Sequence, residues 1–132
     1  MRIDQTGGAL SAAAAFEMAG LAPTEISVAQ LYDSFSANPL MYLEEFGFVK
    51  PGGAPALVRG GGTSPDGNLP VNTNGGLLSY GHSGDSSGMS MIVEAALQVR
   101  RRAGKRQVPR VRSAFVHAHG GMSSEHASLV LG

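Results

Sequence analysis

The sequence contains no cysteine among its 132 residues. A disulfide scaffold and a zinc site built on thiolates are therefore excluded, and so is a catalytic thiol supplied by this chain. Excess charge is also absent, because ten Lys and Arg residues balance ten Asp and Glu residues. A neutral protein has no overall field that attracts polyanions or anionic membranes. We therefore expect no nucleic-acid partner.

Long apolar runs are absent as well, and none approaches the roughly 18 residues that span a bilayer. Residues 1–5, MRIDQ, lack the basic and apolar regions of a signal peptide. These features predict a cytoplasmic protein without a membrane span. An apolar fraction of 42% is ordinary for a folded domain, and 132 residues suffice for one domain with a modest core.

Basic residues are abundant in one place, since seven of the ten fall between residues 100 and 112. They follow a predicted helix, and cations near a helix C-terminus interact favourably with the helix dipole. The simplest interpretation is a solvated helix end. A surface for a phosphate-bearing ligand or an acidic partner is the alternative.

The pattern of apolar residues and turn residues alternates between helical and extended segments, which is typical of a layered α/β domain. In such sheets, ligands gather beyond the carboxyl ends of the strands. Tyr32-Asp33 and residues 117–121 occupy strand ends, so we expect them to converge with the glycine-rich segment that precedes the third long helix. The predicted elements are helices 9–20, 36–46 and 85–102, strands 26–31, 112–118 and 126–131, and short strands 56–59 and 69–72 in an irregular segment 48–76.

Several histidine and serine motifs admit more than one chemistry. His82 is framed by glycines before a helix, where an imidazole can titrate near neutrality, although a structural histidine fits the motif equally well. His117 and His119 would share one face of a strand, and with His126 they could form a three-nitrogen zinc site. The serine-elbow pattern around Ser86 predicts no hydrolase, because the only acid between Ser86 and His117 lies in the same predicted helix.

Three blocks of the sequence, taken in order, resemble the C-terminal domain of thiolases. The resemblance is closest to the sterol-carrier-protein and lipid-transfer type and to acetyl-CoA acetyltransferases, and it covers nearly all of residues 1–132. Leu31-Tyr32-Asp33-Ser34-Phe35-Ser36 is similar to the family's Asn-Glu-Ala-Phe or His-Asp-Cys-Phe block. Residues 74–84 are similar to its Gly-Gly…Gly-His-Pro-x-Gly block, and residues 117–122 to its Cys-x-Gly-Gly-Gly loop.

The resemblance implies a thiolase-like C-terminal half, a layered α/β domain with a mixed five-stranded sheet and helices on its faces. It also implies an acyltransferase that makes or breaks a carbon–carbon bond next to a coenzyme A thioester, with no permanently bound cofactor. The family's nucleophilic cysteine belongs to an N-terminal half that this sequence lacks. The implied partners are therefore an acyl-CoA substrate, an N-terminal thiolase half or subunit, and a small OB-fold/zinc-ribbon protein.

The resemblance assigns roles to individual residues. His82 matches the histidine that activates the nucleophile and helps to form an oxyanion hole. Tyr32 takes the position of the Asn or His that holds a water in that hole, and Asp33 matches the acidic residue that organises the site. Gly81 and the pair Gly120-Gly121 are expected to bind the thioester substrate.

The closing loop departs from the family pattern, because histidine replaces the second catalytic cysteine. Aligned on Gly120-Gly121-Met122, His117 takes the place of that acid/base, and a slip in the loop would give the role to His119 instead. An imidazole with an ordinary pKa near 6.5 suits general base work. Claisen condensation, thiolysis and retro-aldol cleavage all remain open.

An apolar helix face, residues 88–99, calls for burial against another chain. We therefore expect an oligomer or a heteromeric complex, and poor solubility of the chain alone. A non-catalytic interaction domain that keeps the fold in order to pair with a partner is the alternative function.

Overall fold

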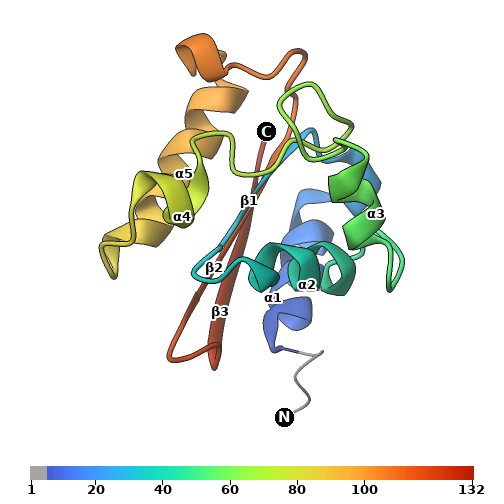
Figure 1. The fold of residues 1–132 in the computed structure, drawn as a ribbon, viewed down its shortest axis with the longest axis vertical. Helices are drawn as coiled ribbons and strands as arrows, with labels where there is room; N and C mark the ends of the chain where they lie inside the picture. The colour runs from blue at the N-terminus through green and yellow to red at the C-terminus, as the bar shows by residue number, and fades with distance from the viewer. Residues whose placement is uncertain (1–5) are drawn as a thin grey trace.

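A computed structural model describes residues 6–132, so the expectation about residues 1–5 lies outside the described residues. The chain folds around one small sheet with helices on both of its faces (Figure 1). The elements are α1 (Gly8–Ala19), η1 (Pro23–Glu25), β1 (Val28–Leu31), α2 (Ala37–Glu45), α3 (Ala54–Arg59), α4 (Gly76–Tyr80), α5 (Ser86–Val99), η2 (Gly104–Arg106), β2 (Ala114–Gly120) and β3 (Glu125–Leu131).

The sheet is mixed, with the strands in the order β1-β2-β3. β1 runs parallel to β2, and β2 pairs with β3 in the antiparallel sense. Helices α1 and α2 cover one face and α5 covers the other (Figure 1). On the α1 face, the ring of Phe115 stacks 4.9 Å from that of Phe16. On the α5 face, Met91 and Ala95 are completely buried. The α/β prediction is therefore confirmed.

The prediction of a five-stranded sheet is wrong for residues 6–132, where the sheet has three strands. Residues 56–59 belong to α3 and not to a strand, because Pro55 stands in the first turn, where its fixed φ favours a helix. Residues 69–72 contribute a single parallel bridge between Val71 and Ala29. Beyond that bridge, the Asn72 side chain replaces a backbone partner for Leu31. It accepts a hydrogen bond from Leu31 N–H at 2.8 Å and donates one to Leu31 C=O at 2.9 Å.

Helix ends follow the local chemistry of the chain. α1 ends as predicted at Gly20, which adopts the left-handed conformation of a helix C-cap. The helix predicted to end at residue 102 stops at Val99, and Arg101 beyond it has a φ of 56°. The five-residue helix α4 was not predicted, because a carboxylate from another segment caps it, as described below.

A buried carboxylate ties α5 to the segments around it. Glu94 is 2% exposed and accepts hydrogen bonds from Thr73 Oγ1 at 2.7 Å, Gln98 Nε2 at 3.0 Å and Arg106 Nη2 at 2.8 Å. Burial alone would raise the pKa of Glu94, but these hydrogen bonds and the Arg106 charge hold it below the ordinary value of 4.5. The carboxylate thus remains ionised inside the protein.

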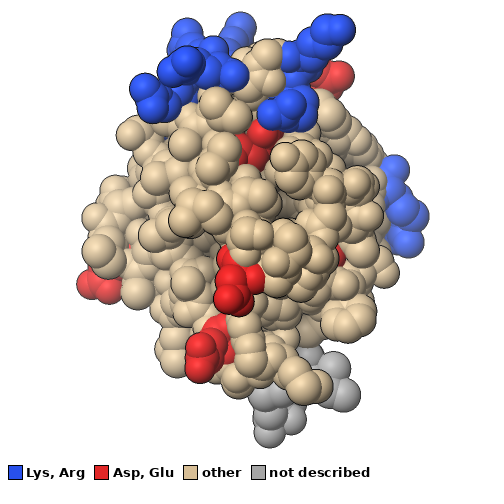
Figure 2. Space-filling model, turned by 90° about the vertical axis from the view of Figure 1, so that its left-hand side faces the viewer, with Lys and Arg blue, Asp and Glu red and all other residues tan. Residues whose placement is uncertain are grey.

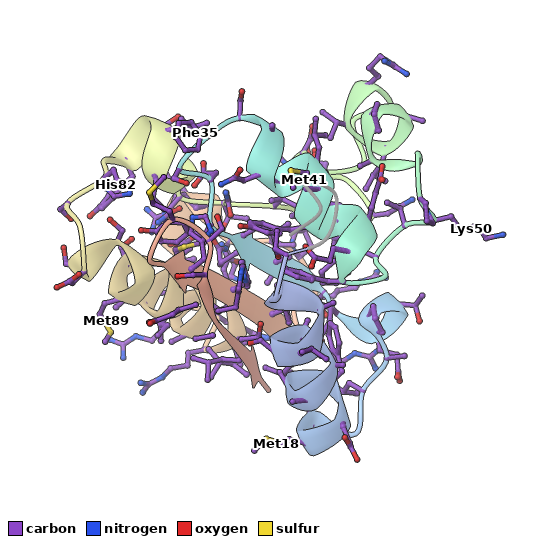
Figure 3. The ribbon with its side chains drawn as sticks, turned by 90° about the horizontal axis from the view of Figure 1, so that it is seen from below. Met18, Phe35, Met41, Lys50, His82 and Met89 are labelled. Carbon is purple, nitrogen blue, oxygen red and sulfur yellow. The ribbon has the colours of Figure 1, made fainter. Side chains whose placement is uncertain are left out.

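Basic side chains and exposed apolar side chains are each concentrated on part of the surface. Figure 2 shows Lys and Arg side chains gathered at one end, where α5 and η2 finish. Apolar side chains are exposed on α4 and α5, with Tyr80 at 71%, Met89 at 57% and Val93 at 50%. Met89 points away from the body of the molecule in Figure 3. In the part of the chain that the structure describes, no helix is both long and apolar enough to span a bilayer.

Candidate active site

A cavity of about 650 Å³ opens where β1 and β2 end and α5 begins. Its walls come from the segment after β1, the loop before α5 with the first turn of that helix, and the end of β2 with the turn that follows. Figure 3 shows His82 and Phe35, from two of these segments, close together at this edge. The predicted convergence of the three segments is confirmed. The basic surface lies at the other end of α5.

Tyr32 and His82 form the first polar pair of the cavity. Tyr32 follows β1 directly and is 7% exposed, whereas His82 lies in the exposed loop before α5. The Tyr32 hydroxyl lies 3.3 Å from His82 Nε2, and the rings meet edge to face. The Gly84 N–H donates to His82 Nδ1 at 3.4 Å, which favours the tautomer with the proton on Nε2. The Tyr32 oxygen then accepts a hydrogen bond from His82 Nε2–H, and the hydrogen of the Tyr32 hydroxyl can point into the cavity.

His119 is the second imidazole of the cavity. Its ring centroid lies 4.7 Å from that of Tyr32, and its Nε2 lies 3.2 Å from Ser34 Oγ. Its Nδ1 lies 2.8 Å from both the Tyr42 hydroxyl and Ser123 Oγ. Burial, followed by the nearby imidazoles, lowers the pKa of His119 below 6.5. The side chain is therefore neutral near pH 7, and both of its ring nitrogens form hydrogen bonds.

His117 lies behind the cavity and lines no part of it. It is fully buried on β2, with the rings of Tyr42 and Phe46 at 4.3 Å and 4.7 Å. Its Nε2 lies 3.0 Å from His126 Nδ1, and its Nδ1 has no hydrogen-bond partner among residues 6–132. Burial and the neighbouring imidazoles lower the pKa of His117 to about 3. Of the two histidines left open by the sequence, the structure brings His119 to the cavity and keeps His117 in the core.

Asp33 shapes the site without entering the cavity. Its carboxylate is 4% exposed and accepts from Leu77 N–H at 2.7 Å and from Leu78 N–H at 3.5 Å, at the start of α4. Gly76 lies against this carboxylate with a φ of 63°, and a Cβ at that position would lie 2.7 Å from the Asp33 carboxyl carbon. The Asp33 carboxylate thus fixes the start of α4, the segment that leads to His82.

The three glycines predicted to bind the substrate separate in the structure. Gly120 and Gly121 line the cavity, whereas Gly81 ends α4 outside its lining. Beside Gly120 a Cβ would find open space, so this stretch of backbone is accessible to a ligand. Two of the three therefore border the cavity, and the third does not.

A metal centre finds no support in the described chain. Within residues 6–132, no group of three or more His, Cys, Asp or Glu side chains is arranged to hold a metal ion. The rings of His117, His119 and His126 do lie together, with centroids 5.3–6.3 Å apart. However, His126 bonds to His117 through Nδ1 and to the Ser123 carbonyl oxygen through Nε2, so both of its nitrogens are occupied.

Three polar residues around His119 had no role in the sequence prediction. Ser34 belongs to the same block as Tyr32, whereas Ser123 lies in the loop after β2, one residue beyond the matched residues 117–122. Tyr42 is on α2, 77 residues from His119, and no sequence pattern links the two. Only the packing of α2 against the sheet brings its hydroxyl to the imidazole.

The fold and the cavity define a layered α/β domain whose ligand site lies beyond the ends of its strands, with two imidazoles and a phenol at its centre. Residues 2–132 match the family model described as thiolase C-terminal domain-like. The chain belongs to this family.

Similar proteins include an acetyl-CoA acetyltransferase of Methanothermobacter thermautotrophicus, 39% identical over 120 residues that cover 91% of this chain and 31% of the relative. Sterol carrier protein 2 of Oryctolagus cuniculus is 40% identical over 105 residues, covering 80% of this chain and 19% of the relative. Among solved structures, the Ltp2-ChsH2(DUF35) aldolase superposes with a TM-score of 0.81 at 35% identity, over 94% of this chain and 31% of that chain. The chain thus spans about a third or less of these proteins.

Proposed function

We propose that this chain is the C-terminal part of a thiolase-like enzyme that makes or breaks a carbon–carbon bond next to a coenzyme A thioester. The observation that carries the proposal is the convergence of Tyr32, His82 and His119 on one cavity, from segments far apart in the chain. Relatives named as an acetyl-CoA acetyltransferase and as an aldolase support this reaction class.

Tyr32, His82 and His119 supply the acid/base and oxyanion groups of the proposed site. Both directions of the chemistry pass through an enolate of the thioester, whose negative charge develops on the carbonyl oxygen. Hydrogen-bond donors fixed around that oxygen lower the barrier without having to reorganise. The predicted role of residues 117–119 in contacting substrate falls to His119, because His117 is fully buried behind the cavity.

The covalent and non-covalent branches of the chemistry have different requirements. Thiolysis through an acyl-enzyme needs a nucleophilic cysteine, which this chain does not contain and which an N-terminal half or subunit would supply. Retro-aldol cleavage of a β-hydroxyacyl thioester needs only a base for the hydroxyl proton, donors for the enolate oxygen and a proton for the carbon released. The products are then a carbonyl compound and the shortened thioester.

The exposed apolar side chains of α4 and α5 are the surface that we propose for an N-terminal half or subunit. The solved relative is named as a complex of two components, which supports a partner chain here and keeps the small OB-fold/zinc-ribbon protein as a candidate. A homo-oligomer of the complete protein and a cytoplasmic location belong to the same proposal. The non-catalytic interaction domain is the competing function for this surface.

The test is the activity of the complete enzyme, this chain together with the rest of the protein or the chain that co-purifies with it. Acyl-CoA thiolysis and cleavage of β-hydroxyacyl-CoA would be measured for wild type, His82→Ala and His119→Ala. We expect each substitution to reduce kcat by roughly 100-fold or more, the usual effect of losing an oxyanion donor or a general acid/base. Full activity in both variants would reject the catalytic proposal and favour the interaction domain.

A matched control keeps a loss of folding apart from a loss of chemistry. Ser79→Ala removes a hydroxyl from an exposed side chain shortly before the same loop, outside the lining of the cavity. It should retain activity. Unfolding curves of all variants, measured under the assay conditions, show whether the complex remains intact.

A further inference from the structure

Tyr42 is a buried phenol that reaches the cavity only through His119. It lies on α2, is 1% exposed, and its hydroxyl lies 2.8 Å from His119 Nδ1. Ser123 Oγ approaches the same nitrogen at 2.8 Å. Two hydroxyl groups therefore converge on one ring nitrogen, and this nitrogen is turned away from Ser34, which bonds to Nε2.

The donors around His119 determine which nitrogen carries its proton. A phenol is far more acidic than an alcohol, so in this cluster Tyr42 is the stronger donor, and an imidazole nitrogen with a lone pair is the stronger acceptor. Burial raises the pKa of Tyr42 to about 12, so the phenol keeps the proton that it donates. A neutral imidazole that accepts at Nδ1 must carry its hydrogen on Nε2.

We infer that Tyr42 is a positioning residue that holds His119 in the Nε2–H tautomer, so that His119 acts as a hydrogen-bond donor to a substrate oxygen and not as the base. The inference rests on the proposed function, because it divides the acid/base and oxyanion roles between the two imidazoles of that site. His119 becomes a donor for the enolate oxygen. Another group of the complete site must then transfer the proton. In this chain the candidate is His82, whose imidazole is exposed.

The Nε2 side of His119 fits the same assignment. Ser34 Oγ already accepts a hydrogen bond from Asn38 Nδ2 at 3.0 Å, and its second lone pair is available to His119 Nε2–H at 3.2 Å. The Ser34 hydrogen is then free to point into the cavity, which Ser34 also lines. In the absence of a substrate, Ser34 thus takes the place of the oxygen that His119 would bind.

Five other titratable side chains surround His119. They are Tyr32 after β1, Tyr42 on α2, His82 before α5, His117 on β2 and His126 on β3.

The first test reads the tautomer directly in the complete protein. ¹⁵N chemical shifts of [¹⁵N]histidine distinguish Nδ1–H from Nε2–H, and this chain has four histidines, which single substitutions assign. We expect a protonated Nε2 at His119 in wild type and in Ser79→Ala. In Tyr42→Phe we expect the Nδ1 and Nε2 shifts to move toward each other as the tautomers mix, and Ser123→Ala should retain Nε2–H. A protonated Nδ1 in wild type, or an unchanged tautomer in Tyr42→Phe, would overturn the inference.

The second test separates a donor from a base by activity. The amide of a glutamine reaches about as far as His119 Nε2 and donates a hydrogen bond, but it cannot act as a base. If His119 is a donor, His119→Gln should retain roughly tenfold more activity than His119→Ala, and Tyr42→Phe should lose roughly tenfold in kcat with little change in KM. Equal loss in His119→Gln and His119→Ala would contradict the donor role.

The two proposals fail in different ways. Full activity in His119→Ala removes His119 from the proposed function, whatever its tautomer. Inactive His119→Ala and His119→Gln with a proton on Nδ1 would leave the proposed function standing and reject the role of Tyr42.

Discussion

Gly76 offers a strong test of how the site is built, because a single methyl group there would meet a buried charge. The Cβ of an alanine would lie 2.7 Å from the carboxyl carbon of Asp33, well inside van der Waals contact. The backbone at Gly76 also has a φ of 63°, which only glycine adopts freely. We therefore expect Gly76→Ala to be strongly destabilising and to displace the segment that carries His82.

The magnitude follows from two separate costs. An L-residue in the left-handed conformation costs about 1–2 kcal/mol. To escape the methyl group, the Asp33 carboxylate must give up its hydrogen bond to Leu77 N–H, and a hydrogen bond to a charged group contributes about 1.5–3 kcal/mol. The sum is about 2.5–5 kcal/mol. Gly20→Ala is the matched control, because Gly20 has a φ of 64° and a Cβ there has no neighbour within 4 Å. It should cost only the first amount.

The assay is urea unfolding of the purified protein, followed by circular dichroism, for a double-mutant cycle. Asp33→Ala removes the carboxylate that the new methyl group would strike. In that background Gly76→Ala should add only about 1–2 kcal/mol, so the two positions should show a coupling of about 1.5–3 kcal/mol. If Gly76→Ala costs no more than Gly20→Ala, or if the cycle shows no coupling, the contact between Asp33 and Gly76 is not as described.

Two further predictions concern pH. The pKa of His117 is lowered to about 3 in the folded protein. Between pH 6.5 and 3, His117 is therefore protonated in the unfolded chain but not in the folded one. Stability should therefore fall with falling pH by up to about 1.4 kcal/mol per unit, and unfolding of His117→Gln measured over the same range should depend on pH less steeply. The pKa of Glu94 lies below 4.5, so its contribution is complete above that pH and disappears as the pH falls further. Glu94→Gln should lower the free energy of unfolding at pH 7 by only about 1–2 kcal/mol, because Arg106 is partly exposed. It should also remove the part of the stability that is lost below pH 4.5. An unchanged dependence of stability on pH in that range would refute the assignment.

The order of the main elements could be predicted because short-range patterns decide it. The alanine-rich stretch that closes with Gly20, and the apolar stripe of α5, are local signals that tertiary contacts reinforce. The small elements between residues 48 and 80 were not predictable in the same way. α4 has only five residues, and it depends on a carboxylate that lies more than 40 residues earlier in the chain.

The prediction of a five-stranded sheet failed for a related reason. Residues 69–72 look like a strand, but strand pairing depends on which partner offers free backbone groups. At Leu31 the Asn72 side chain meets those groups, so the ladder ends after one bridge. Side-chain competition of this kind leaves no periodic signal in a sequence.

By itself, the sequence determined the α/β class, the family, and the three segments that meet at the site, because each of these depends on motifs and periodicities within short stretches of chain. Only the tertiary structure could distinguish the surroundings of His117 from those of His119. Both imidazoles point to the same face of β2. They differ in that His117 is fully buried, whereas His119 lines the cavity. Burial and hydrogen bonding to distant residues, Tyr42 above all, are properties of the packed molecule, and they decide what each histidine can do.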